Sequence, residues 1–321
     1  MEKGSGTLKA VLYPWAKESA MKKKNLLCIS LLLVLMIVFV ACNGNPNSGG
    51  SSGGSMSTGI YGEIADYMDE NPQFAGDWNK AAIAYIESRL PAEYELIMRF
   101  SENDYTAGAI SSSNIVTHKY VKTAEGLWLE QTRTVNGAPP VIEDGIKIRN
   151  GVGGADDILY IYDASAYAIV NAADIADAEL ERDTLKASLF SAMTWYGSFG
   201  SMFDAIELAM EQVSQMGYDF IALLAQQGLA FTIDRNATLS VGGTARACDM
   251  FGITIDDTVD DPSAPSPTYH VMECFVDKTN GICLKLSNID YAQRAGDVKE
   301  SETIIEATSF KTASVTPILF P

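Results

Sequence analysis

The chain has 321 residues and a formal net charge of −18, and 47% of its residues are hydrophobic. Such an acidic surface repels nucleic acids and anionic headgroups, so we expect no nucleic-acid partner. Without its first 41 residues the chain has 280 residues and a charge near −22, which suits one large β-rich domain or two small ones.

The segment 21–57 has the composition of an export and anchoring signal. Three lysines at 22–24 precede an apolar run of 15 residues at 26–40, which is short for a membrane-spanning helix. Residues 39–42, Phe-Val-Ala-Cys, resemble the lipobox of bacterial lipoproteins. This resemblance implies a signal peptide over 21–41, lipidation of Cys42, and an extracytoplasmic protein held on a bacterial membrane. An uncleaved N-terminal anchor is the alternative.

The remaining boundaries follow from composition. Residues 1–20 precede a complete signal and are expected to be an over-extended start. Residues 42–57 are rich in Gly, Ser and Asn, which is typical of a flexible tether. We expect residues 58–321 to form a single domain.

Two helices are predicted before residue 91. The first, within 60–72, ends at Pro72, and the second occupies 76–90 with Asp77 as its N-cap. The second helix places its apolar residues at helical spacing: Trp78, Ala82, Ile83, Ile86 and Leu90.

A series of strands follows. In 92–102, Tyr94, Leu96, Met98 and Phe100 alternate with polar residues, which indicates a strand with one buried face. Further β-rich runs are 115–122, 126–135, 141–149, 157–163 and 167–171. Short turns of Gly, Pro and Asn separate them, so neighbouring strands should be antiparallel.

The segment of about 174–228 predicts a helical insert. One apolar stripe contains Leu180, Leu185, Leu189, Phe190 and Met193, and a second contains Phe203, Ile206, Met210 and Val213. Such stripes need an apolar partner, and the sheet is the one of matching size. Strands then resume at 228–236, 237–243, 244–257, 267–277, 281–290 and 302–312.

Two stretches carry a family resemblance. The sequence VDKTNGICLKL at 276–286 predicts a hairpin in which Gly281 has a positive φ, and SVGGTARACDMF at 240–251 predicts a turn before a strand. Their order resembles the C-terminal half of outer-membrane lipoprotein-sorting (LolA-like, LppX-like) proteins, over about 90–317. The resemblance implies an α+β fold: a curved, mostly antiparallel β half-barrel with helices covering the concave face, and a hollow that receives acyl chains. It also implies a disulfide between Cys248 and Cys283.

The aromatic cluster of the helical insert is the candidate ligand site. Its residues are Trp195, Tyr196, Phe199, Met202 and Phe203, and glycines flank them. They are either core contacts between helix and sheet or a mobile lid that lines a hydrophobic hollow.

Catalytic and metal chemistry are not expected. We interpret His118 and His270 as solvated strand residues, and the sequence has no HExxH and no phosphate-binding P-loop. The acidic loop containing Asp256, Asp257, Asp260 and Asp261 is either a calcium site or a solvated loop, and its spacing fits no EF-hand. We therefore expect a non-enzymatic protein without cofactors that binds an apolar ligand, or else a structural or interaction lipoprotein with a filled core.

Overall fold

The computed structural model describes residues 60–152, 156–163, 165–187, 189–190, 215, 219–226, 228–256, 269–292 and 298–321. The predictions for residues 1–59, including the signal peptide, lipidation of Cys42 and the tether, concern residues outside this part of the chain.

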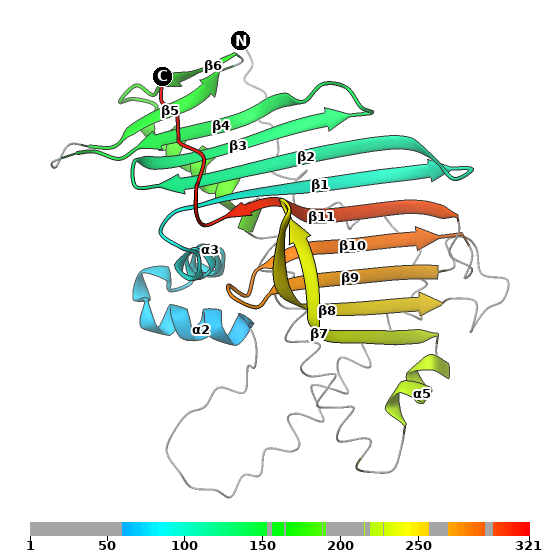
Figure 1. Ribbon diagram of the computed structural model, residues 1–321. Coiled ribbons are helices and arrows are strands. Elements are labelled where there is room, and N and C mark those ends of the chain that lie inside the picture. The colour runs from blue at the N-terminus through cyan, green and yellow to red at the C-terminus, as the bar shows by residue number, and fades with distance from the viewer. Residues whose placement is uncertain are drawn as a thin grey trace, which may run out of the picture.

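Eleven strands form one open antiparallel sheet in the order β6-β5-β4-β3-β2-β1-β11-β10-β9-β8-β7 (Figure 1). The strands of the N-terminal half are β1 (Tyr94–Thr106), β2 (Ala109–Thr123), β3 (Gly126–Val135), β4 (Val141–Arg149), β5 (Ile158–Asp163) and β6 (Ala166–Ile169). Those of the C-terminal half are β7 (Leu229–Val241), β8 (Thr244–Asp256), β9 (Tyr269–Asp277), β10 (Cys283–Tyr291) and β11 (Lys299–Lys311).

The strand order explains why a long insert separates the halves. The N-terminal meander runs outward from β1 to the edge strand β6, and the C-terminal meander starts at the opposite edge with β7 and ends at β11 beside β1. The chain between β6 and β7 must therefore cross the full width of the sheet, about 48 Å at the usual strand spacing.

The helices are short and lie where sequence signals place them. They are α2 (Ile60–Glu70), the 3-10 turn η1 (Pro72–Phe74), α3 (Trp78–Arg89) and α5 (Phe220–Gln226). The side chain of Asp77 accepts a hydrogen bond from the Lys80 backbone N–H, which confirms the predicted N-cap. Residues 175–187 and 189–190 are also helical, and we call them the covering helix.

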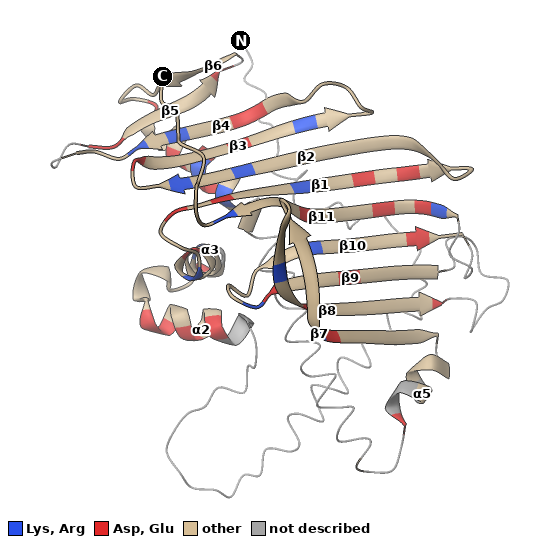
Figure 2. Cartoon of the chain, in the orientation of Figure 1, with Lys and Arg blue, Asp and Glu red and all other residues tan. Residues whose placement is uncertain are grey.

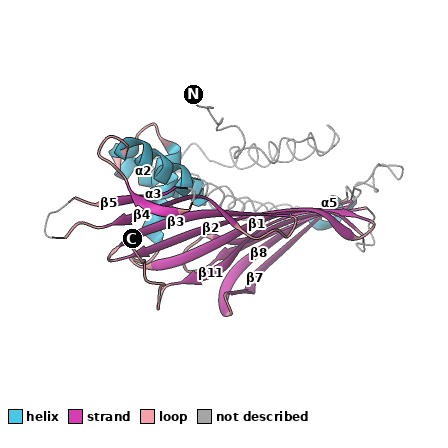
Figure 3. Cartoon of the chain, turned by 90° about the horizontal axis from the view of Figure 1, so that it is seen from above, coloured by secondary structure: helices cyan, strands magenta, loops and turns pink. Residues whose placement is uncertain are grey.

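Helices gather on one face of a twisted, curved sheet. Figure 3 shows α2 and α3 on one side of it, while β7 and β8 curve toward the other side. The expected α+β half-barrel with an antiparallel sheet is confirmed, since all the described strand pairs are antiparallel and the sheet does not close.

The main core lies between these helices and the sheet. Strand register aligns Leu96, Tyr120, Leu129 and Ile146 across β1, β2, β3 and β4 on one face. Ile86 and Leu90 of the α3 region and three residues of the covering helix join them in one buried cluster: Leu185, Leu189 and Phe190. Leu180 is 66% exposed, so its assignment to the buried stripe was wrong. Ala178, Leu185 and Leu189 form the buried stripe of this helix, and Leu180 lies on its opposite side.

Candidate functional site

The face that carries the helices has an apolar row across seven strands. Tyr120 marks this face, because its ring packs edge to face on Phe190 of the covering helix, with ring centroids 5.4 Å apart. Alternate residues of a strand share a face, so Val116, four residues before Tyr120 on β2, lies on the same face. From β2 to β7 the register aligns Val116, Phe100, Ile305, Leu286, Cys274, Phe251 and Ile233. The four central members are buried and the outer three are half-buried.

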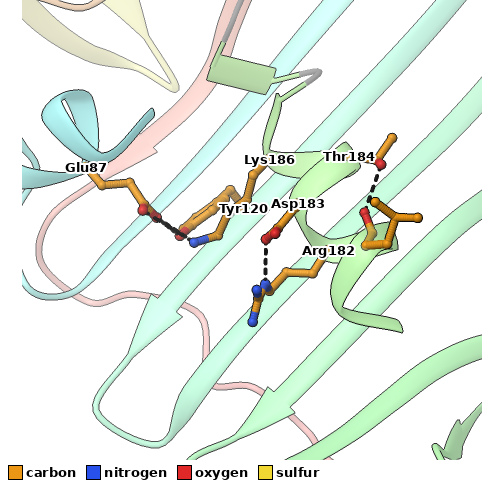
Figure 4. Close-up of polar contacts among 7 residues, drawn as sticks. Glu87, Tyr120, Arg182, Asp183, Thr184 and Lys186 are labelled. Atoms are coloured by element: carbon orange, nitrogen blue, oxygen red, sulfur yellow. Dashed lines mark hydrogen bonds and ion pairs between the residues drawn. The ribbon is translucent and has the colours of Figure 1, made fainter. Parts of the chain in front are cut away.

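Two helices that are distant in sequence meet beside this row (Figure 4). Glu87 of α3 accepts hydrogen bonds from the Tyr120 hydroxyl and, at 3.0 Å, from Lys186 Nζ of the covering helix. Tyr94 stacks on Tyr120 with ring centroids 5.1 Å apart. Burial, with the neighbouring Tyr94 and Glu87, raises the pKa of Tyr120 well above its ordinary value. The contacts hold both helices on the sheet at one end of the strands.

Moving along the strands, the face becomes mixed and then polar. The next aligned row consists of half-buried residues: Phe231, Ile253, Met272, Asn288 and Thr303. In the row after it, β8 and β7 contribute the apolar Ile255 and Leu229, whereas the other strands contribute polar residues: His270, Asp290, Ser301, Asp104 and Ser112. We call these five polar residues the polar rim.

Hydrogen bonds organise the polar rim. Asp290 lies 2.8 Å from His270 Nδ1 and accepts a hydrogen bond from the Ser301 hydroxyl at 2.6 Å. Ser112 donates to Asp104 at 2.6 Å. Burial alone would raise the pKa of Asp290, but the His270 and Ser301 hydrogen bonds outweigh it and lower that pKa. Figure 2 shows acidic residues on β1, β10 and β11, at the ends of these strands that are far from α2 and α3.

His118 is not a solvated strand residue, so the prediction was wrong for this histidine. His118 is 7% exposed, and it meets the Phe100 ring edge to face at 5.0 Å. Burial lowers its pKa to about 4, so the imidazole is neutral near pH 7. His270 is half-buried and paired with Asp290. The adjacent charged residue, Lys119, lies on the opposite face of the same strand.

The opposite face carries the C-terminal tail, residues 312–321, which crosses β1 to β4 toward β5 (Figure 1). We call this face of the sheet the strap-bearing face, because the tail lies across its strands. Glu95 is 2% exposed and accepts hydrogen bonds from Lys311, Ser309 and Thr316. Lys147 donates to the Leu319 carbonyl at 2.7 Å and lies 4.7 Å from the centre of the Trp128 ring. This face is therefore held together by charge-assisted contacts.

The structure describes few of the sequence-predicted site residues. Trp195, Tyr196, Phe199, Met202 and Phe203 lie outside the described residues, as do Asp257, Asp260 and Asp261. Asp256 is described and is a buried residue at the end of β8. Gly281 has a φ of +68°, which confirms the predicted hairpin conformation.

The described cysteines are Cys248, Cys274 and Cys283, and all three are buried thiols. The Sγ atom of Cys283 lies 3.6 Å from that of Cys274, and the Cys248 thiol faces the Arg246 carbonyl. The expected bridge between Cys248 and Cys283 stays a prediction, and the geometry favours a different partner for Cys283.

The described residues contain no group of three or more His, Cys, Asp or Glu side chains arranged to hold a metal ion. Their helices are all too short or too polar to cross a membrane.

Comparison with known proteins identifies no family for this chain. No family model matches, and no curated protein matches. Among solved structures, the chain is similar to a DUF1329 family protein from Desulfovibrio piger, with 10% sequence identity and a TM-score of 0.19. The match covers 74% of this chain and 94% of the other. A likeness at this TM-score carries no conclusion about function.

Proposed function

We propose that this protein binds an amphiphile, such as an acyl chain with a polar head, on the helix-bearing face, and that it does so without catalysing a reaction. The supporting observation is the order of the rows along the strands. An apolar row lies beside the helices, a half-buried mixed row follows, and the polar rim completes the series. A ligand that is apolar at one end and polar at the other matches this order.

The alternative is a structural or interaction lipoprotein whose own side chains fill the space over the sheet. The buried state of Leu286, Cys274 and Phe251 favours it, because these central residues of the apolar row are already covered. The mixed row, which is half-buried throughout, favours the binding proposal instead.

A binding measurement separates the two functions. The purified full chain should release lipid into organic solvent, and after this extraction it should take up a fluorescent fatty acid. Val116 and Ile115 are half-buried neighbours on β2 that point to opposite faces, which makes them a matched pair. Val116→Trp should weaken uptake about tenfold by filling space on the helix-bearing face. Ile115→Trp should leave uptake unchanged. A clean extract with no uptake would establish the filled-core alternative.

We further propose that the protein is exported and anchored by acyl chains on Cys42. The support is the sequence of the basic, apolar and lipobox-like segments. Metabolic labelling with palmitate should mark the wild-type chain and not Cys42→Ser. A labelled Cys42→Ser chain, or wild type that retains its N-terminal residues, would indicate an uncleaved anchor.

A further inference from the structure

Two buried thiols on adjacent strands form a pair that the sequence did not single out. Cys274 lies on β9 and Cys283 begins β10, with 1% and 2% exposure. Their Sγ atoms are 3.6 Å apart. A disulfide requires about 2.05 Å, so the sulfurs must approach by about 1.5 Å.

Strand register explains why these two thiols meet. Cys283 is aligned with Val276, and the register shifts before Lys285, so that one extra residue bulges from β10. Gly281 turns the chain just before, and the Asp277 carboxylate accepts hydrogen bonds from the backbone N–H groups of Thr279 and Asn280. The hairpin therefore fixes Cys283 diagonally opposite Cys274. Cys248 is aligned with Asp277, and its thiol faces the Arg246 carbonyl.

We propose that Cys274 and Cys283 are a disulfide site, which is oxidised when the chain folds in the presence of a disulfide-containing oxidant. A thiolate of one cysteine attacks the oxidant's disulfide and releases one thiol. The thiolate of the other cysteine then attacks the mixed disulfide and releases the second thiol. Two protons and two electrons thus pass from the pair to the oxidant.

The environment of the pair determines when this step occurs. The hydrogen bond with Cys283, followed by burial, raises the pKa of the Cys274 thiol well above its ordinary value. Thiolate, not thiol, is the reactive form, so exchange is slow once β9 and β10 are packed. The bridge should form during folding and then resist reductants that do not unfold the protein.

Peptide mapping identifies the partners, but trypsin alone is insufficient. No Lys or Arg lies between Cys248 and Cys274, so one tryptic peptide holds both of them, and Cys283 lies in the next peptide, 279–285. Adding a protease that cuts after Glu273 separates Cys248 from Cys274. The full chain, folded under oxidising conditions and digested unreduced, should give 274–278 joined to 279–285. Alkylated Cys274, or a link from Cys248 to Cys283, would overturn the proposal.

Free thiols can be counted in denaturant after oxidative folding. This count does not depend on the stability of the folded variant. Cys274→Ser and Cys283→Ser should each raise the count by one, because each frees the former partner. Cys248→Ser should lower the count by one. A bridge between Cys248 and Cys283 would reverse the results for Cys248→Ser and Cys274→Ser, and a chain without any bridge would lose one thiol in all three variants.

Discussion

The two faces of the sheet use the same four strands in opposite ways. On the helix-bearing face, β1 to β4 align Leu96, Tyr120, Leu129 and Ile146, all at most 2% exposed. One residue earlier or later in each strand, the strap-bearing face aligns Glu95, Val121, Trp128 and Lys147. The first row excludes water by packing against helices, and the second is covered by the C-terminal tail.

The two covering elements are held on the sheet by different kinds of contact. Helices on the apolar row are stabilised mainly by the area they remove from water, which has no preferred direction. The tail buries Ile318, and it is also held by directional contacts, such as those of Thr316 with Glu95 and of the Leu319 carbonyl with Lys147. An apolar cover can shift or be replaced by another apolar surface at little cost, whereas the tail must keep its partners in register. The helix-bearing face is thus the one suited to a varied apolar ligand.

Shortening the Phe190 side chain of the covering helix should have the largest effect on the free energy of unfolding. Phe190 is fully buried on Tyr120, so Phe190→Ala should lower the free energy of unfolding by about 3–5 kcal/mol. Phe320 of the tail is half-buried against Tyr160, and Phe320→Ala should cost less than half as much. Urea denaturation of both variants measures this. An equal loss in both would mean that the tail, too, is held by apolar burial.

Removing the charge of Glu95 tests the directional contacts. Burial alone would raise the pKa of Glu95, but the hydrogen bonds from Lys311, Thr316 and Ser309 outweigh it and hold that pKa at about 2. Because the folded-state pKa is depressed, its contribution is present above about pH 4.5 and is lost as the pH falls through about 2. Glu95→Gln should cost about 2 kcal/mol at pH 7 and flatten the acid dependence in this window.

The exposed Glu125 supplies the control for Glu95. Glu125→Gln should leave stability between pH 2 and pH 7 close to that of wild type. Urea denaturation at several pH values measures both variants, and an unchanged acid dependence in Glu95→Gln would contradict the role assigned to this carboxylate.

Sequence periodicity predicted the elements well because each strand shows a buried face by itself. The predicted runs 126–135 and 141–149 coincide with β3 and β4. The pairing of β1 with β11 could not be predicted, since it joins residues about 200 positions apart and leaves no local signal. Of the predicted insert, the described residues 175–187 and 189–190 pack on the sheet through Leu185, Leu189 and Phe190. Leu180 is exposed because it lies on the opposite side of this helix.

The polar residues of the site were the hardest to predict. A charged residue in an alternating strand indicates a solvated face, and this rule failed for Glu95, which the tail covers. It failed also for His118, which is buried against the Phe100 ring although the adjacent Lys119 is charged. The polar rim depends on five residues from five strands, and only strand register brings these residues together.

A smaller effect on the free energy of unfolding is expected from Glu181, where the covering helix meets β4. Burial, followed by the nearby Asp144 carboxylate, raises the pKa of Glu181 to about 7. The pKa of Asp144 is itself raised by burial and by Glu143. Because the folded-state pKa of Glu181 is raised, its stabilising contribution is complete below about pH 4.5 and is lost as the pH rises through about 7.

Glu181→Gln should therefore leave stability unchanged in acid and raise it by about 1 kcal/mol at pH 8, after allowance for solvent screening of a half-exposed group. Glu179→Gln is the matched control, because Glu179 is exposed on the same helix. Urea denaturation from pH 5 to pH 8 should show a fall in stability for wild type and Glu179→Gln that is absent in Glu181→Gln. Parallel curves for all three would mean that the helix contacts β4 through apolar packing alone, which would make the two faces still more different.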